Sequence, residues 1–144
     1  MNTKHVPDLE HCQELDRLCK EKGIVMPWTE YQWQIGGKLS GETTATLVPT
    51  NRPPTYGSAD SAWRFIPAPL VSEQGKWLPN ERRDKLAFFS GLAINGWFCE
   101  VKNYRVMPYE RFHVILQEDT EANARMKCLL YLLENDIIDG NAFN

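Results

Sequence analysis

The stretch LAFFSGLAINGWFCEVK, residues Leu86–Lys102, decides the fold. Within it, Asn95-Gly96 separates two apolar runs, Leu86–Ile94 and Trp97–Lys102. An Asn-Gly pair in this setting is the strongest short-range signal of a β-hairpin, because both turn positions need a positive φ angle. The stretch therefore predicts two antiparallel strands, and Phe112–Gln117 is a candidate for a further strand.

Three strands are predicted upstream of this hairpin. Aromatic and polar side chains alternate over Glu30–Ile35, which is typical of a half-buried strand. Thr43–Val48 is rich in β-branched residues and is expected to pair back as a hairpin or meander. A short strand over Ala62–Ile66 is expected to stop at Pro67, because proline cannot donate a hydrogen bond to a sheet.

Helices are predicted at both ends of the chain. Apolar residues recur at helical spacing over Asp8–Lys22, and Gly23 is a natural C-terminal stop. Thr120 caps a long helix that is predicted to run to about Asp136, and Leu70–Leu78 is expected to form one or two helical turns. Because the strands cluster rather than alternate with long helices, we expect an α+β fold. In this fold the N- and C-terminal helices pack on a mainly antiparallel sheet.

The length of 144 residues and the hydrophobic fraction of 42% bound the architecture. A chain of this length fits one domain, so residues 1–144 are predicted to form a single α+β domain. The segment 49–60, PTNRPPTYGSAD, is predicted to be a long Pro/Gly-rich loop, and the tail 139–144 is expected to fray. No apolar run approaches the roughly 18 residues of a membrane span, so no membrane partner is expected.

The cysteine pattern favours buried, reduced thiols. None of the four cysteines stands in a C-x-x-C spacing, so neither a zinc ribbon nor a thioredoxin-like motif is indicated. His11 lies next to Cys12, but adjacent side chains on a helix point about 100° apart and do not make a ligand pair. We therefore expect no metal site and no cofactor. The N-terminal residues lack the apolar core of a secretory signal, so a reducing cytoplasm is the expected location.

Four short motifs carry a resemblance to a group of known proteins. They are Ile66-Pro67-Ala68, Lys76-Trp77-Leu78-Pro79, Glu121-Ala122-Asn123-Ala124-Arg125 and Tyr131-Leu132-Leu133-Glu134-Asn135. From Ile66 onward the chain resembles small α+β proteins of bacterial phages and prophages, whose function is unknown. In that group a strand ends in IPA, a WLP turn follows, and the chain closes with a helix of this kind. The resemblance implies a phage-type origin and no particular activity, because the group shares no catalytic motif.

The sequence holds few elements of a catalytic site. It contains no nucleotide P-loop, no G-x-S-x-G nucleophile turn and no H-E-x-x-H zinc motif. A Cys99–His113 pair, with Glu100 or Glu110, is one arrangement that would give a thiol nucleophile and its base. A buried thiol and a hydrogen-bonded strand histidine are the favoured interpretation of the same residues.

A second candidate function is the binding of single-stranded nucleic acid. Residues 79–113 carry six Lys/Arg and four Asp/Glu, a local charge of +2, although the whole chain carries −3. Basic and aromatic side chains interleave over 102–113, and single-strand binders combine cationic grooves with aromatic stacking platforms in this way. The residues predicted to bind are Tyr104, Arg105, Tyr109 and Arg111.

The aromatic content favours a protein partner. Trp, Tyr and Arg are the usual anchors of protein interfaces, and the five tryptophans either fill the core or anchor such an interface. Edge strands also favour self-association as a homodimer. We therefore expect a non-catalytic accessory or binding protein of phage type, acting through an aromatic-rich surface. A single-stranded nucleic-acid binder is the first alternative, and an enzyme with a Cys/His site is the second.

Overall fold

The computed structural model describes residues 3–37, 43–50, 64–79, 86–102 and 113–143. Its helices and strands, in chain order, are η1 (Thr3–His5), α1 (Leu9–Lys22), β1 (Tyr31–Gly37), β2 (Thr43–Pro49), β3 (Arg64–Ala68), α2 (Val71–Trp77), β4 (Ala87–Ala93), β5 (Gly96–Lys102), β6 (His113–Glu118), α4 (Glu121–Glu134) and η3 (Gly140–Phe143).

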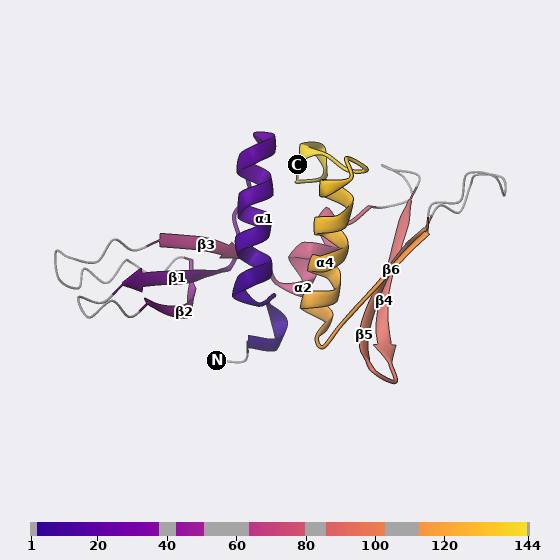
Figure 1. Ribbon diagram of the computed structural model, residues 1–144, viewed down its shortest axis with the longest axis horizontal. Coiled ribbons are helices and arrows are strands. Elements are labelled where there is room, and N and C mark those ends of the chain that lie inside the picture. Colours follow the sequence, from indigo (N-terminus) through magenta and orange to yellow (C-terminus); the bar gives the residue numbers. More distant parts are fainter. Residues whose placement is uncertain (1–2, 38–42, 51–63, 80–85, 103–112, 144) are drawn as a thin grey trace.

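The strands form two antiparallel sheets, so the predicted α+β fold is confirmed. The first sheet has the order β2-β1-β3 and the second has the order β4-β5-β6. The terminal helices α1 and α4 lie side by side between the two sheets (Figure 1). Each helix therefore packs mainly on a different sheet, α1 on β3 and α4 on β4, β5 and β6, rather than both on one continuous sheet.

The hairpin of the second sheet confirms the prediction from the Asn-Gly pair, with a shift of one residue. Ala93 pairs with Gly96, so the two-residue turn is Ile94-Asn95. Gly96 has φ +130°, and Asn95 does not adopt a positive φ. A Cβ on Gly96 would also lie 2.6 Å from the carbonyl oxygen of Glu118, so close approach of β6 requires glycine here.

The first sheet forms where alternation and β-branched residues predict it. Tyr31, Trp33 and Ile35 share the face that packs on a small buried cluster with Leu47 and Ile66.

The expected end of β3 at Pro67 is wrong. The strand continues to Ala68, and Pro67 pairs with Gln32 inside it. Because β3 is at the edge of its sheet, a residue without an N–H is tolerated there.

The main core lies around α4. Most of its buried side chains come from α1, α2, β5 and α4, and they include Leu15, Trp77, Val101, Leu129 and Leu132. This helix is buried along most of its length, which agrees with its nearly continuous apolar sequence.

Both terminal helices begin or end as the sequence predicts. Gly23 ends α1 in the left-handed conformation with φ +69°, and the Thr120 side chain accepts a hydrogen bond from the Asn123 N–H at the start of α4.

The C-terminal tail differs from its prediction. Gly140–Phe143 forms a short 3-10 helix, and Phe143 is buried against Trp77 with ring centroids 5.3 Å apart. The expectation of fraying fails because one aromatic side chain, Phe143, is sufficient to dock the tail on the main core.

Candidate functional site

The residues predicted to bind nucleic acid are not among those that the structure describes. Tyr104, Arg105, Tyr109 and Arg111 all lie in the segment 103–112. The same holds for residues 51–60 of the predicted loop. Nucleic-acid binding therefore stays a prediction from sequence.

The structure does not bring Cys99 and His113 together. Cys99 pairs with Leu116 across the β5–β6 ladder, whereas His113 pairs with Lys102. Three residues along a strand span roughly 10 Å, so the two backbone positions are too far apart for a direct hydrogen bond between nucleophile and base. Cys99 is also fully buried, and a hydrogen bond to it, together with burial, raises the pKa of the Cys128 thiol.

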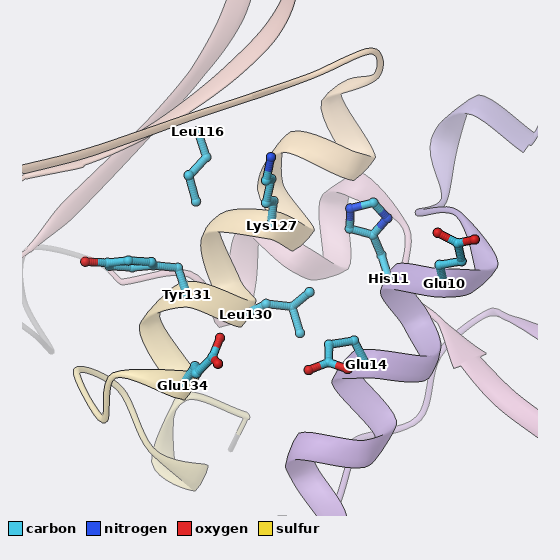
Figure 2. A pocket seen from close by; sticks show the side chains of 8 residues that line it. All are labelled: Glu10, His11, Glu14, Leu116, Lys127, Leu130, Tyr131 and Glu134. Carbon is cyan, nitrogen blue, oxygen red and sulfur yellow. The ribbon is translucent and has the colours of Figure 1, made fainter.

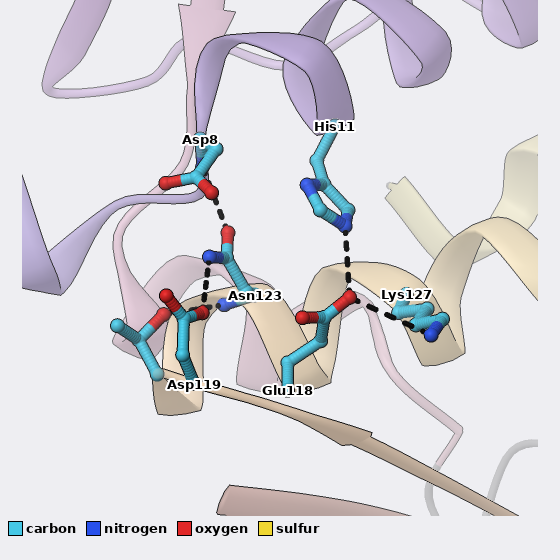
Figure 3. A network of polar contacts seen from close by, with 7 residues as sticks. Asp8, His11, Glu118, Asp119, Asn123 and Lys127 are labelled. Atoms are coloured by element: carbon cyan, nitrogen blue, oxygen red, sulfur yellow. Dashed lines mark hydrogen bonds and ion pairs between the residues drawn. The ribbon is translucent and has the colours of Figure 1, made fainter. Parts of the chain in front are cut away.

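A polar network joins the N-terminal ends of the two long helices (Figure 3). The Glu118 carboxylate lies 3.4 Å from Nε2 of His11 on α1 and 3.5 Å from Nζ of Lys127 on α4. Glu118 therefore cross-links α1 to α4, and its only partners among the described side chains are these two.

Asn123 completes this network from a fully buried position. Its Oδ1 accepts a hydrogen bond of 2.8 Å from the backbone N–H of Asp8, and its Nδ2 donates one of 2.9 Å to the Asp119 carboxylate. Because the Asp8 side chain makes no capping bond, Asn123 satisfies a backbone donor at the start of α1 from another helix.

A pocket of about 370 Å³ lies beside this network, between α1 and α4, and we call it the interhelix pocket. It is lined by Glu10, His11, Glu14, Leu116, Lys127, Leu130, Tyr131 and Glu134 (Figure 2). Figure 2 shows Leu130 between the carboxylates of Glu14 and Glu134. The pocket thus combines an apolar floor with acidic side chains from both helices.

The second sheet exposes apolar side chains, together with the polar Glu100, Lys102 and Gln117, on the side away from α4, and we call this side the outer face. The register places Phe89, Gly91, Phe98, Glu100 and Ile115 together there. Phe89 is 58% exposed and Ile115 is 50% exposed. The Phe89 and Phe98 rings contact each other with centroids 5.8 Å apart, and a Cβ on Gly91 would meet the Phe98 ring at 3.1 Å.

The tryptophans divide between the core and the surface. Trp77 is buried, while Trp33 and Trp97 are half-buried against the two apolar clusters. Trp28 is 66% exposed, and Trp63 lies outside the described residues. The apolar outer face is therefore formed by phenylalanine and isoleucine rather than by tryptophan.

Sequence reasoning missed both surfaces, although each leaves a signal. Consecutive Phe88 and Phe89 in a strand must point to opposite faces, so one of them has to leave the core side. Glu10 and Glu14 are four residues apart on a helix and share one face. The missing information was which elements flank these faces.

Searches of the described residues and of known proteins add no further assignment. Among the residues that the structure describes, no group of three His, Cys, Asp or Glu side chains is placed to hold a metal ion. No helix in the same part of the chain is long and apolar enough to cross a membrane. No protein family matches the chain, and neither a curated protein nor a solved structure matches it significantly. The phage-type origin therefore stays a prediction.

Proposed function

We propose that this protein is a non-catalytic binding protein that associates with a second copy of itself through the outer face of the β4-β5-β6 sheet. The observation that carries the proposal is the exposure of Phe89 and Ile115 beside the Phe98 ring, on a face that no described element covers. Antiparallel sheets usually have one apolar face and one polar face. A second apolar face supports a second packed layer.

The charges on this face support a second copy as the occupant. Glu100 and Lys102 lie on the same side of β5, with Nζ and the carboxylate 3.6 Å apart. In a two-fold arrangement the same patch meets itself, so a suitably placed axis brings the ammonium of each copy to the carboxylate of the other. A patch with one charge of each sign is complementary to itself, whereas a strongly charged partner would leave one of the two unmatched.

The remaining features fit an accessory protein of this kind. All four cysteines are free and buried, which is consistent with the reducing cytoplasm as the location we propose. The resemblance to phage and prophage proteins makes an accessory role in that setting the corresponding prediction. The non-catalytic part of the proposal is supported by the separation of Cys99 from His113 along the β5–β6 ladder.

Sedimentation equilibrium over a range of protein concentrations tests the proposal. The wild-type chain is expected to dimerise, and the double variant Phe89→Lys/Ile115→Lys is expected to be monomeric because it brings like charges together at the contact. Phe65→Lys is the matched control, since Phe65 is an exposed phenylalanine, 41% accessible, on the first sheet. This control is expected to dimerise as the wild type does.

Two outcomes contradict the proposal. One is a wild-type chain that stays monomeric at the highest concentration reached. The other is a double variant that keeps its fold by circular dichroism and still dimerises, because association then uses another surface.

A further inference from the structure

We infer that the free edge of β4 is a second contact between copies of this chain, at which β4 pairs antiparallel with β4 of another copy. The edge is a different surface from the outer face, because strand pairing extends a sheet sideways, whereas the outer face stacks two sheets. Where both contacts form, two of the proposed dimers join into a tetramer. Only this last step rests on the proposed function.

The edge of β4 is accessible. This strand is the outer one in the order β4-β5-β6, and no strand among the described residues pairs with its other side. Each of its seven residues is half-buried or exposed, whereas the central strand β5 buries Cys99 and Val101 completely. The backbone N–H and C=O groups on the free side of such a strand are a template for pairing with another chain.

This edge also lacks the features that usually protect a free edge. Residues 86–99, LAFFSGLAINGWFC, contain no charged side chain and no proline. The other outer strands of the two described sheets differ, because Pro67 lies within β3, Pro49 ends β2 and Glu118 ends β6. Natural proteins protect free edges with proline, charges or bulges. An edge without them indicates a strand that is paired in the assembled protein.

The sequence of β4 favours a second copy as the occupant. A two-fold axis at Ser90, the middle residue, gives the antiparallel register that overlaps all seven residues of the strand. This register places Phe88 opposite Leu92 of the other copy, and Phe89 opposite Gly91. Each ring therefore meets a smaller residue, and no charge is buried between the strands.

The exposure of Leu92 supports this register. Phe88, Ser90 and Leu92 alternate onto the side of the sheet that α4 covers. Phe88 packs against the main core, and Ser90 donates a hydrogen bond of 3.1 Å to Glu121 on α4. Leu92 lies two residues closer to the turn and is 70% exposed. Pairing brings Phe88 of the other copy beside Leu92, so a side chain that one copy leaves in water is covered.

The symmetry of the edge contact is compatible with that of the proposed dimer. The two-fold axis that pairs the β4 strands is perpendicular to the sheet, whereas the axis that stacks two outer faces runs parallel to it. Perpendicular two-fold axes are those of a tetramer with D2 symmetry, a common form among closed oligomers. In this tetramer, two sheets lie edge to edge in each of two stacked layers.

Sedimentation equilibrium of three variants separates the two contacts. The wild type is expected to form tetramers from dimers as its concentration rises. Leu92→Glu is expected to stop at the dimer, with the dissociation constant of the tetramer raised at least about tenfold, because pairing would bury a carboxylate beside Phe88. Ile115→Lys, on β6, is expected to keep a dimer through β4 alone. The combination Leu92→Glu/Ile115→Lys is expected to be monomeric.

A matched control and a related variant complete this series. Val25→Glu makes the same change of charge at a residue that is 88% exposed between α1 and β1, and it is expected to form tetramers as the wild type does. Phe89→Lys places a charge within β4 itself, so Phe89→Lys/Ile115→Lys removes both contacts and is monomeric. Leu92 is exposed, so Leu92→Glu is expected to fold, which circular dichroism checks.

The outcomes distinguish this inference from the proposed function. A wild-type dimer that Leu92→Glu leaves unchanged overturns the edge contact and leaves the proposed function standing. A dimer that Leu92→Glu abolishes and Ile115→Lys preserves supports the edge contact and contradicts the outer face. A folded Leu92→Glu variant that forms tetramers as tightly as the wild type overturns the edge contact, and a monomeric wild type overturns both.

Hydrogen exchange tests strand pairing directly. In Ile115→Lys, the amides of β4 that point away from β5 are expected to exchange more slowly as the protein concentration rises, because pairing gives them an acceptor. If this variant associates while the exchange of all β4 amides stays independent of concentration, copies of the chain meet elsewhere and the inference is wrong.

Discussion

The two sheets of this protein differ in the side chains on the face that points away from the buried clusters. In the first sheet, Tyr31, Trp33 and Ile35 of β1 point to the buried cluster, and Gln32 and Gln34 point the other way. In the second sheet, the residues opposite the α4-covered face include Phe89 and further apolar side chains of the outer face. The apolar side chains of β1 in the first sheet therefore lie on one face, whereas those of β4 in the second sheet lie on both faces.

This difference shows why the second sheet is the surface to test for association. Exposed apolar side chains scattered singly are normal, but a contiguous apolar patch on a sheet marks an interaction site. On the second sheet, Phe89 and Phe98 are in ring contact and Ile115 lies across Glu100 from Phe89, whereas Phe65 on the first sheet is an exposed phenylalanine that pairs with Gln34.

The largest expected effect separates the two cores. Leu132→Ala removes a fully buried side chain from the main core and is expected to lower the free energy of unfolding by about 2–5 kcal/mol. Ile66→Ala, in the smaller cluster under the first sheet, is expected to lower it by about 2 kcal/mol, since a small cluster collapses more easily around a cavity. Urea denaturation measures both, and an equal or larger loss for Ile66→Ala would contradict this ranking.

The next effect concerns the link between the regions that carry the two sheets. Asn123→Ala leaves the backbone N–H of Asp8 without its acceptor and is expected to cost about 1–3 kcal/mol of stability. Asn135→Ala is the control, because Asn135 is exposed at the end of α4 and bonds only to the carbonyl of Tyr131. Its expected effect is within about 0.5 kcal/mol. If urea denaturation gives the two variants equal losses in the free energy of unfolding, the buried hydrogen bond of Asn123 contributes no more to stability than the exposed one of Asn135.

A third prediction compares one thiol from each cluster. Burial raises the pKa of Cys12, in the first-sheet cluster, to about 12, and that of Cys19, in the main core, to about 11. Unfolded thiols ionise near the ordinary value while the folded thiols stay neutral. Stability is therefore fully present below the ordinary cysteine pKa and is lost as the pH rises toward the folded values.

The corresponding measurement is the free energy of unfolding at neutral pH and at about pH 10. At the higher pH, the contribution of each buried thiol to this free energy is expected to be lower by on the order of 1 kcal/mol. Cys12→Ala and Cys19→Ala are each expected to reduce this alkaline loss. A variant with an unchanged difference between the two pH values would exclude its thiol as a source.

Much of the fold follows from local signals in the sequence. The Asn-Gly hairpin, the alternation of β1 and the glycine stop of α1 all depend on residues within one element, and each is present. The errors arise where tertiary context decides. Pro67 remains in a strand because β3 is an edge strand, and Phe143 docks the tail on Trp77.

The candidate sites were less predictable for the same reason. His11 and Glu118 are far apart in sequence and meet only because α1 lies against α4. The outer face likewise depends on which side of the second sheet α4 covers, and the alternation of AFFSGLA gives two apolar faces without ranking them.

A fourth and smaller effect on the monomer sharpens the comparison of the outer surfaces. Phe89→Ser and Phe65→Ser both remove an exposed ring, and each is expected to change the stability of the dilute protein by no more than about 0.5 kcal/mol. The wild-type melting temperature is expected to rise with protein concentration, because dimerisation stabilises the folded state. Phe89→Ser should remove this dependence and Phe65→Ser should keep it. If Phe65→Ser removes the concentration dependence and Phe89→Ser keeps it, the dimer contact lies on the first sheet.

The smallest expected effect concerns the exposed side of α1, the helix that lies between the first sheet and α4. A hydrogen bond from Arg17 lowers the pKa of Glu14, so this carboxylate stabilises the fold above the ordinary glutamate pKa, and its contribution is lost as the pH falls through the folded value. Arg17→Gln should therefore be slightly less stable than the wild type at neutral pH, and the difference should shrink at about pH 3 as the Glu14 carboxylate takes up its proton. Lys20→Gln removes a neighbouring pair with Asp16 and serves as the control for charge alone. If Arg17→Gln differs from the wild type by the same amount at both pH values, the effect comes from lost packing of the arginine stem along α1 rather than from its bond to Glu14.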